Sequence, residues 1–484
     1  MAGKKTVVKF GTDGWRGIIA DDFTYENVRT AAAAITHYVL DVEDGAEKGV
    51  CIGYDTRFGS RRFAMLVADT LAGAGVPVAF ASGITSTPAL SFTVLHRKAA
   101  GGVMITSSHN PANWNGVKYK ASYGGAGKPY IIAAIETYLE KPLPKTATPA
   151  KITEADFHPE YLEAIKAFVD LKAIARSGYK FLIDPMYGTG SGIISTIFED
   201  ADIPCVEIRG EQNPLFPGIN PEPIMPHIQA TCDAVVANKC DAGLITDGDA
   251  DRIGAVDEKG NVVTSHMIFA VMLNWLLERK KWPGDVTRAF NTTLMLDRIA
   301  KKYGRRLHEH GIGFKFVTDL ILEHEILIGG EESGGIGIAK HLPERDGLLN
   351  SLVLANVMAD EKKTLGQLVK ALQDEFGVHE YGRIDMHIAN EIKESAIARA
   401  KKIQAGDAGF SGLKVLRVET MDGIKFFLDN AGGKNNPKTA ETWLLLRASG
   451  TEPLLRVYCE APSKETVQKV LAAAEAFVLQ GAKA

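Results

Sequence analysis

The chain has 484 residues, of which 45% are hydrophobic and 24% charged, so it carries enough apolar side chain for more than one core. At about 150 residues per domain, this length predicts roughly three domains and allows four. The 55 basic and 59 acidic residues give a formal net charge of -4, which excludes an overall basic field that would attract nucleic acid or an anionic membrane. Anionic ligands must therefore be held by local groups.

The apolar runs, the first residues and the cysteines of the sequence are those of a cytoplasmic protein without a membrane span. The densest apolar run, residues 267–277, is shorter than the about 20 residues that a bilayer span needs, so we expect no membrane partner. Residues 1–14 contain lysines but no long apolar stretch with a cleavage site, and we expect a cytoplasmic protein, either a monomer or a homodimer. The 5 cysteines form no Cys-x-x-Cys pair, which favours reduced thiols over disulfides or structural zinc.

Strand, loop, helix and strand follow one another repeatedly along the first three quarters of the chain, which is typical of an α/β fold. The first repeat predicts a strand at 50–54, a helix at 61–74 and a strand at 76–80. The second predicts a strand at 180–183, a helix ending at 200 and a strand at 205–208. A weaker third repeat starts with a strand at 288–290 and has a helix ending near 303–304.

The last hundred residues have a different pattern. Strands with alternating polarity are predicted at 384–387 and 413–418, and helices at 391–405 and 464–480, which indicates a small α+β domain. A stretch rich in Pro and Lys at 141–149 reads as a linker that closes the first domain. We therefore predict four domains, which are three related α/β domains and a C-terminal α+β domain. Their predicted bounds are 1–150, 151–263, 264–378 and 379–484.

The most specific motif is acidic and lies between two apolar runs. Asp247, Asp249 and Asp251 are crowded into five residues, and their mutual repulsion favours a bound divalent cation. A solvated acidic turn is one alternative. A helix-loop-helix calcium loop is another, with Glu258 in its twelfth position, but Arg252 stands where that loop needs Gly and the flanks read as strands. We favour metal binding.

A second loop, residues 106–111, follows a predicted strand and brings a hydroxyl, an imidazole and an ammonium group together. Ser108 is adjacent to His109, and Lys118 follows within ten residues. On its own, the Ser-His-Asn-Pro string is good turn chemistry. No Gly-x-Ser-x-Gly pattern surrounds Ser108, which disfavours an α/β-hydrolase triad, so transfer of a phosphoryl group fits better.

Two further loops offer groups for a sugar phosphate. Residues 447–453, between two predicted strands, carry a guanidinium, two hydroxyls and a glycine, which could surround a phosphate with donors, although a plain hairpin turn is the alternative. Residues 329–335 form a glycine-rich loop with two carboxylates and a hydroxyl, which suits hydrogen bonds from sugar hydroxyls. A flexible surface loop is the alternative there.

Taken in chain order, these motifs resemble the signature set of the α-D-phosphohexomutases, the family that includes phosphoglucomutase and phosphomannomutase. The resemblance covers nearly the whole chain. It rests on five segments, which are 11–17, 106–111, 247–252, 330–334 and 447–453. It implies three domains with mixed sheets sandwiched by helices and a distinct C-terminal domain, arranged around a central cleft that contains the active site.

The resemblance also implies a role for individual residues. Ser108 would carry the phosphoryl group, and with Asp247, Asp249 and Asp251 it would bind Mg²⁺. Arg16 and Arg252 would be cationic partners, and Lys118 would act as acid and base with His109 assisting. The expected substrate contacts are Glu331, Ser333, Lys315, Arg345, Arg447, Ser449, Gly450 and Thr451. Two positions depart from the family pattern: Ser107 stands where many members have Ala, and Arg345 where Lys is common.

The implied reaction interconverts hexose 1-phosphate and hexose 6-phosphate through a phosphoserine enzyme, with a hexose 1,6-bisphosphate as intermediate and primer. Glu332 resembles glucose-preferring members, so glucose is the first expectation and mannose the second. Three alternatives remain open. They are a phosphoglucosamine mutase, a metal-dependent sugar-phosphate phosphatase and a non-catalytic binder of sugar phosphates.

Overall fold

The structure of the protein is a computed structural model, which describes residues 8–11, 14–42, 45–144, 146, 148–429, 439–449 and 453–480. The chain divides into two compact units. The first unit contains residues 1–272 and 313–366, and the second contains 273–312 and 367–484. The chain passes from one unit to the other within α9 (Ser265–Glu278), just before α11 (Phe314–Glu323) and at the start of α13 (Leu365–Phe376).

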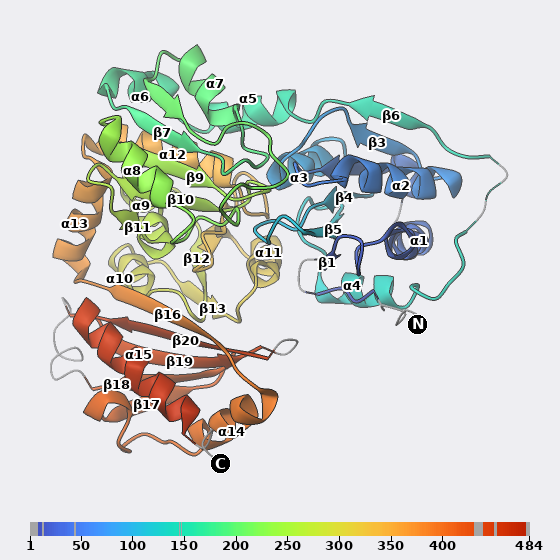
Figure 1. Ribbon diagram of the computed structural model, residues 1–484. Helices are drawn as coiled ribbons and strands as arrows, with labels where there is room; N and C mark the ends of the chain where they lie inside the picture. Colours follow the sequence, from blue (N-terminus) through green and yellow to red (C-terminus); the bar gives the residue numbers. More distant parts are fainter. Residues whose placement is uncertain are drawn as a thin grey trace. The chain divides into compact units, whose positions relative to one another are not determined.

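The first unit begins with a mixed six-stranded sheet in the order β1-β5-β4-β2-β3-β6 (Figure 1). Its strands are β1 (Trp15–Ile18), β2 (Val50–Tyr54), β3 (Val78–Ala81), β4 (Gly101–Ile105), β5 (Trp114–Ala121) and β6 (Ile152–Ala155). The helices of this part are α1 (Tyr25–Asp41), η1 (Ala46–Lys48), α2 (Ser60–Gly73), α3 (Thr87–His96) and α4 (Pro129–Glu136). β5 is antiparallel to both β1 and β4, whereas β2, β3, β4 and β6 run parallel.

The helices of this sheet begin where the sequence supplies capping groups. Thr24 accepts a hydrogen bond from the Asn27 N–H at the start of α1, and Ser86 accepts one from the Ala89 N–H at the start of α3. β2 and β4 are buried along their whole length, as expected for central parallel strands. β6 lies beyond residue 150, where we place the end of the first domain, and pairs with β3. The predicted domain bounds remain a prediction.

A five-stranded sheet in the order β11-β10-β9-β7-β8 follows in the same unit. Its strands are β7 (Phe181–Asp184), β8 (Cys205–Glu207), β9 (Ala242–Thr246), β10 (Ile253–Asp257) and β11 (Val262–Val263). The helices here are α5 (Pro159–Ala167), α6 (Leu171–Ser177), α7 (Ile193–Asp200) and α8 (Gln229–Ala237). The acidic motif is the connection between the antiparallel strands β9 and β10, so its predicted strand flanks are confirmed.

Helix α12 (Gly347–Glu361) packs inside the first unit. Asp346 caps it by accepting a hydrogen bond from the Leu349 N–H, and its residues 347–359 are all buried. It contacts α5, α6, α7, β9 and β10, and its buried polar side chains Asn350 and Ser351 donate hydrogen bonds to the carbonyls of Ile336 and Gly347. The unit also contains the antiparallel pair β14 (Ile326–Gly330) and β15 (Ile336–Ile338), whose connection is the glycine-rich loop.

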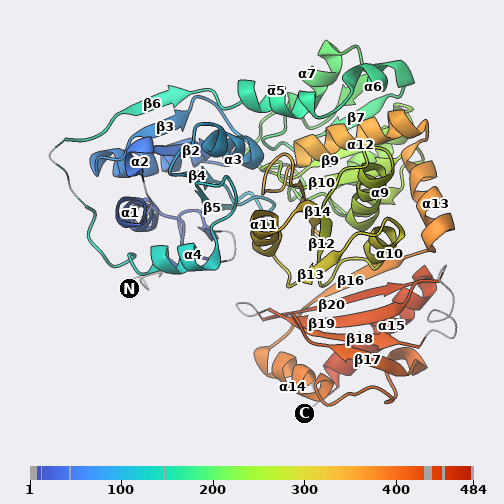
Figure 2. The same cartoon turned by 180° about the vertical axis from the view of Figure 1, so that it is seen from behind.

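The second unit contains a parallel strand pair and a five-stranded antiparallel sheet (Figure 2). The pair is β12 (Asp285–Ala289) and β13 (Leu307–His310), joined through α10 (Met295–Lys302). The sheet has the order β16-β20-β19-β18-β17, with strands β16 (Glu380–His387), β17 (Val415–Glu419), β18 (Ile424–Leu428), β19 (Thr442–Ala448) and β20 (Leu454–Ala461). The remaining helices are α14 (Asn390–Ala400), η2 (Phe410–Gly412) and α15 (Lys464–Leu479), and α15 packs on β16 and β20.

Most predicted elements are present with small shifts in their ends. The strand at 50–54 is β2, and the helix at 61–74 is α2, which starts one residue earlier. The helix predicted over 391–405 is an exception, because α14 ends at Ala400. The chain turns there so that Ile403 packs against the C-terminal core. None of the helices in the described part of the chain is long and apolar enough to span a membrane.

Candidate active site

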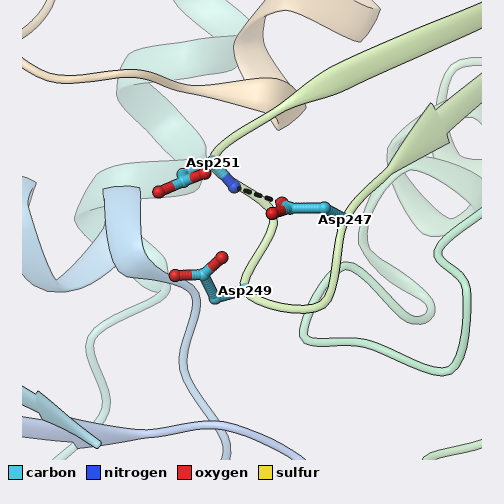
Figure 3. A group of neighbouring side chains, drawn as sticks. All are labelled: Asp247, Asp249 and Asp251. Carbon is cyan, nitrogen blue, oxygen red and sulfur yellow. Dashed lines mark hydrogen bonds between the residues drawn. The ribbon is translucent and has the colours of Figure 1, made fainter. Parts of the chain in front are cut away.

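Three aspartates of the β9–β10 loop form the centre of the candidate site. One carboxylate oxygen from each of Asp247, Asp249 and Asp251 lies within 4.8 Å of the other two. All three residues are 0% exposed. Figure 3 shows them projecting from one loop, in which the Asp251 N–H donates a hydrogen bond to Asp247 Oδ1 at 3.0 Å. The Arg252 N–H donates to the same oxygen at 3.1 Å, so the loop backbone fixes Asp247.

Cationic side chains lie against these buried carboxylates. Lys118 Nζ lies 2.8 Å from Asp249 Oδ2 and 3.4 Å from Asp251 Oδ2, and Arg345 Nη2 lies 2.7 Å from the same Asp251 oxygen. Burial and the two neighbouring carboxylates raise the pKa of Asp247 well above its usual value. Burial also acts to raise the pKa of Asp249, but the charge and hydrogen bond of Lys118, with the Thr87 hydrogen bond and the Arg345 charge, together outweigh it, so this pKa is lowered.

The donor set fits a hard divalent cation. Asp249 Oδ1 and Asp251 Oδ1 are buried and have no hydrogen-bond partner among the described residues. An unpaired buried carboxylate oxygen is costly, and a bound cation would remove that cost. Three carboxylates with no sulfur or imidazole among them are the ligands that Mg²⁺ prefers. The triad is therefore a group that could bind a metal ion.

Ser108 lies beside this triad, in the loop between β4 and β5. Its Oγ donates a hydrogen bond to Asp247 Oδ2 at 2.9 Å, and its side chain is buried. The neighbouring Ser107 is also buried, but its Oγ contacts Asn110 Oδ1 at 3.1 Å instead. The structure thus supports the choice of Ser108 over Ser107. Its backbone has a φ of +51°, a left-handed conformation that a non-glycine residue adopts only when its surroundings hold it there.

The serine loop and the metal loop are in close backbone contact. A Cβ atom added at Gly248 would lie 2.3 Å from the Ser108 carbonyl oxygen, far inside van der Waals contact. Only glycine permits this approach. The glycine between Asp247 and Asp249 therefore allows the hydroxyl of Ser108 to reach Asp247.

Two of the predicted catalytic groups, His109 and Lys118, lie at this centre. His109 Nδ1 is 3.3 Å from Ser108 Oγ. Burial and the nearby cations Arg252, Arg16 and Lys118 lower the pKa of His109 well below its usual value, so the imidazole is neutral at neutral pH. Lys118 is on β5 and buried, and it forms an ion pair with Asp249.

The two predicted catalytic arginines have different surroundings. Arg16, on β1, donates from Nη1 to Asn110 Oδ1 at 3.0 Å and so contacts the serine loop. Arg252 lies 3.3 Å from Glu222 Oε1, and its Nε is 3.8 Å from Asp247 Oδ2. Burial acts to lower the pKa of Arg252, but the surrounding carboxylates, first Asp247, raise it overall, so its guanidinium stays charged.

The glycine-rich loop is linked to the triad through Arg345. This guanidinium, which contacts Asp251, also lies 3.7 Å from Glu331 Oε2. Burial raises the pKa of Glu331 to about 7. Ser333 is half-buried in the same loop. Lys315 lies in the first turn of α11 with its ammonium 5.1 Å from the centre of the Phe316 ring, so its role at the site remains a prediction.

The predicted phosphate clamp belongs to the second unit, at the β19–β20 connection. Arg447 is half-buried, and its Nε donates to Asp422 Oδ1 at 2.9 Å. The Ser449 carbonyl accepts a hydrogen bond from Lys393 Nζ at 3.1 Å. Gly450 and Thr451 lie outside the described residues, as do Thr12 and Asp13 of the first motif.

The site contains contacts that the sequence did not indicate. Thr87 Oγ1 donates to Asp249 Oδ2 at 2.6 Å, and Glu222 faces Arg252. Glu344 pairs with Lys120, their Oε2 and Nζ atoms being 2.5 Å apart, next to the Arg345 contact with Asp251. The sequence signal at Thr87 is only that of a helix start after Ser86, because a contact between residues 162 positions apart leaves no local pattern.

Comparison with known proteins agrees with this geometry. Four families match in chain order: the phosphoglucomutase/phosphomannomutase alpha/beta/alpha domains I, II and III at residues 7–145, 159–260 and 264–376, and the C-terminal domain at 354–476. A phosphoglucomutase/phosphomannomutase of Thermococcus kodakarensis is 29% identical over 96% of both chains. A phosphoglucosamine mutase of Caldicellulosiruptor saccharolyticus is 30% identical over 95% of this chain and 96% of its own.

A solved structure shows the same relation. It is that of a protein from Thermus thermophilus described as a candidate phosphomannomutase, 34% identical, with a TM-score of 0.84 over 98% of this chain and 100% of its own. The relatives are phosphohexomutases, which are isomerases that transfer a phosphoryl group within their substrate. On these matches and on the acidic triad, the chain belongs to the phosphoglucomutase/phosphomannomutase family of the α-D-phosphohexomutase superfamily.

Proposed function

We propose that this enzyme interconverts hexose 1-phosphate and hexose 6-phosphate through a phosphoserine at Ser108 and a hexose 1,6-bisphosphate intermediate. One observation carries the proposal: the Ser108 hydroxyl is buried and lies 2.9 Å from a carboxylate of the acidic triad. A hydroxyl placed against a cation-binding centre is suited to accept and return a phosphoryl group, because this transfer depends mainly on positioning and on neutralisation of charge.

Asp247, Asp249 and Asp251, together with the phosphorylated Ser108, would hold Mg²⁺. When bound, the ion neutralises negative charge on the phosphoryl group as it moves. Arg252 and Arg16 add fixed positive charge around the same loop, and both retain their charge at neutral pH. The buried setting strengthens these interactions relative to water.

The chain also supplies groups that can move protons. When the P–O bond to Ser108 breaks and a bond to the hexose oxygen forms, the hexose hydroxyl loses a proton and Ser108 Oγ gains one. Lys118, whose Nζ lies 2.8 Å from Asp249 Oδ2, is the proposed acid and base: it takes the proton from the hexose hydroxyl and supplies one to the oxygen that leaves phosphorus. His109, neutral and 3.3 Å from Ser108 Oγ, is placed to take up a proton beside it.

The substrate contacts follow from two loops. Glu331 and Ser333 would accept and donate hydrogen bonds to sugar hydroxyls, with Arg345 holding Glu331. Arg447, Ser449, Gly450 and Thr451 would bind the phosphate that is not being transferred. Lys315 is a further proposed contact. Between the two phosphoryl transfers the bound bisphosphate must reorient. The sugar contacts must therefore accept both of its orientations.

We propose glucose as the preferred hexose and mannose as the second. A glucosamine substrate is the alternative that a specific observation favours, since one relative at 30% identity is a phosphoglucosamine mutase. Turnover of glucose, mannose and glucosamine 1-phosphates should be compared with Mg²⁺ and glucose 1,6-bisphosphate present. We expect the highest kcat/KM for glucose 1-phosphate, and a higher value for glucosamine 1-phosphate would replace this assignment.

The same assay tests the reaction class. A mutase forms glucose 6-phosphate, depends on the bisphosphate primer and leaves total inorganic phosphate constant. A metal-dependent phosphatase using the same serine and aspartates would instead release inorganic phosphate steadily. Intact-mass analysis should detect one added phosphoryl group on the enzyme after incubation with glucose 1,6-bisphosphate, and none on Ser108→Ala.

A further inference from the structure

A buried arginine outside the motifs discussed above holds the backbone of the serine loop. Arg57 follows β2, and its side chain is fully buried. Its Nη1 donates hydrogen bonds to the carbonyls of Pro111 at 2.7 Å and Trp114 at 3.2 Å. Its Nη2 donates to the carbonyls of Ser108 at 2.7 Å and Asn110 at 2.6 Å.

These contacts occupy both Nη atoms of the guanidinium. The two Nη atoms carry four hydrogens, and four carbonyls accept them. The fifth N–H, at Nε, is buried and lies 3.2 Å from Asp55 Oδ2 in an ion pair, without a hydrogen bond. Arg57 therefore has no Nη donor left for a substrate phosphate in this arrangement, which distinguishes its task from that proposed for Arg252.

Arg57 is itself held in place from the other side. Asp55 Oδ1 accepts hydrogen bonds from the Arg57 N–H at 2.9 Å and from Ser60 Oγ at 2.7 Å. The guanidinium also lies 5.0 Å from the centre of the Phe216 ring. Asp55 and Ser60 are buried as well, so the guanidinium is fixed before any substrate binds.

The loop needs such support because Ser108 has a left-handed backbone. That conformation is unfavourable for serine and persists only where neighbouring groups over-determine it. The Ser108 carbonyl is fixed by Arg57 on one side and meets the Gly248 backbone on the other, while the Ser108 N–H donates to Thr106 Oγ1 at 2.9 Å. Movement of this carbonyl would move Oγ away from Asp247.

We propose that Arg57 is a positioning residue, which sets the place of Ser108 Oγ by binding four carbonyls of its loop. The inference rests on the proposed function, because it assumes that Ser108 carries the phosphoryl group. A lysine has one nitrogen and cannot reproduce the planar fork that meets four acceptors. Displacement of a reacting atom by about 1 Å can lower a rate roughly 100-fold.

The test uses the full-length enzyme with Mg²⁺ and glucose 1,6-bisphosphate. We expect Arg57→Lys to lower kcat by about 100-fold with KM changed less than about threefold, and to slow phosphorylation of Ser108, followed by intact mass, in proportion. Arg61→Lys is the matched control, because Arg61 lies in the first turn of α2 with a side chain that is 58% exposed. It should retain the kinetics of the wild type.

A merely structural role would reduce the amount of folded enzyme but not the rate of each folded molecule. Rates are therefore divided by the fraction of enzyme that can be phosphorylated, and the melting temperature is measured beside them. A kcat for Arg57→Lys within about threefold of wild type on this basis would overturn the inference. If the Arg57 variants do not fold, Asp55→Asn tests the inference instead. A loss of kcat of about tenfold at constant KM would support the positioning role of Arg57, and an unchanged kcat would refute it.

Chemical rescue supplies an independent readout. Arg57 is among the residues that line a cavity of about 840 Å³, and in Arg57→Ala guanidinium ion should restore at least tenfold of the kcat lost. Ser108→Ala run in parallel separates the two hypotheses. If Ser108→Ala is active, the proposed function fails. If Ser108→Ala is inactive and Arg57→Lys behaves as wild type, only the role of Arg57 fails.

Discussion

The loop pair around Ser108 and the β19–β20 connection are both proposed to bind phosphate, and they are built differently. In the first, Asp247, Asp249 and Asp251 are 0% exposed and fixed by backbone N–H groups and buried cations. In the second, the Arg447 side chain is 23% exposed and paired with Asp422. The difference indicates that the reacting centre is organised before substrate arrives, while the clamp keeps a hydrated arginine available for exchange of partners.

Removal of Ser108 Oγ tests whether this hydroxyl is the reacting group. Ser108→Ala should lower turnover by at least about 1,000-fold, because no other hydroxyl is placed against Asp247 in the described loop. Ser107→Ala is the matched control, since its hydroxyl is equally buried but contacts Asn110. It should stay within about tenfold of wild type, measured as formation of glucose 6-phosphate. Similar rates for Ser108→Ala and Ser107→Ala would contradict the assignment of Ser108 as the reacting residue.

Removal of divalent cations tests whether the three buried aspartates form a cation-binding site. Chelation with EDTA should abolish turnover, and Mg²⁺ should restore it. At 100 times its dissociation constant, Mg²⁺ should raise the free energy of unfolding by about 3 kcal/mol, since it relieves repulsion in the folded state alone. Asp249→Asn should remove most of this stabilisation. Equal stabilisation of wild type and Asp249→Asn in chemical denaturation would show that the ion binds elsewhere.

A third change is directed at the clamp. Arg447→Ala should raise KM for glucose 1-phosphate by about 10- to 100-fold and change kcat less, because it removes a contact made equally in the ground and transition states. Arg417→Ala is the control, since Arg417 lies in the same sheet and makes exposed ion pairs with Glu419 and Glu441. Steady-state kinetics measure both constants. A fall in kcat at constant KM would place Arg447 with the reacting centre instead.

The pH dependence of stability should depend modestly on Glu331. Burial raises the pKa of Glu331 to about 7 from 4.5, so the folded state holds this proton to a higher pH than the unfolded state does. The resulting stability is complete below pH 4.5 and is lost as pH rises through 7. The free energy of unfolding should therefore fall between pH 5 and pH 8 in the wild type. This fall should exceed that of Glu331→Gln by at most about 3 kcal/mol, measured by chemical denaturation. Glu325→Gln is the control, because Glu325 is exposed, and it should keep the wild-type difference.

Sequence patterns predicted most elements of the fold, because apolar periodicity is a local property. β2, α2, β9, β10 and α15 all appear close to their predicted residues. The end of α14 at Ala400 was missed because packing of Ile403 on the C-terminal core decides it, and that contact is tertiary. The central cleft and the domain bounds stay predictions.

Within the candidate site, the sequence indicated the groups but not their partners. The acidic loop is recognisable because three carboxylates within five residues repel one another unless a cation or a hydrogen-bond network offsets their charge. The roles of Thr87 and Arg57 could not be predicted, because each contacts a loop far away in the sequence: Thr87 meets Asp249, and Arg57 meets the Ser108 carbonyl. Arg345 was expected to contact substrate, and the structure shows that it also neutralises Asp251.

The contact between Gly248 and the Ser108 carbonyl has a consequence for protein engineering. Because even one methyl group at residue 248 would collide with that oxygen, Gly248 cannot be replaced while the serine loop is kept. A library that varies the acidic loop to change ion selectivity should hold Gly248 constant or diversify residues 106–111 at the same time. Attempts to graft one loop alone onto another scaffold would lose the alignment on which its chemistry depends.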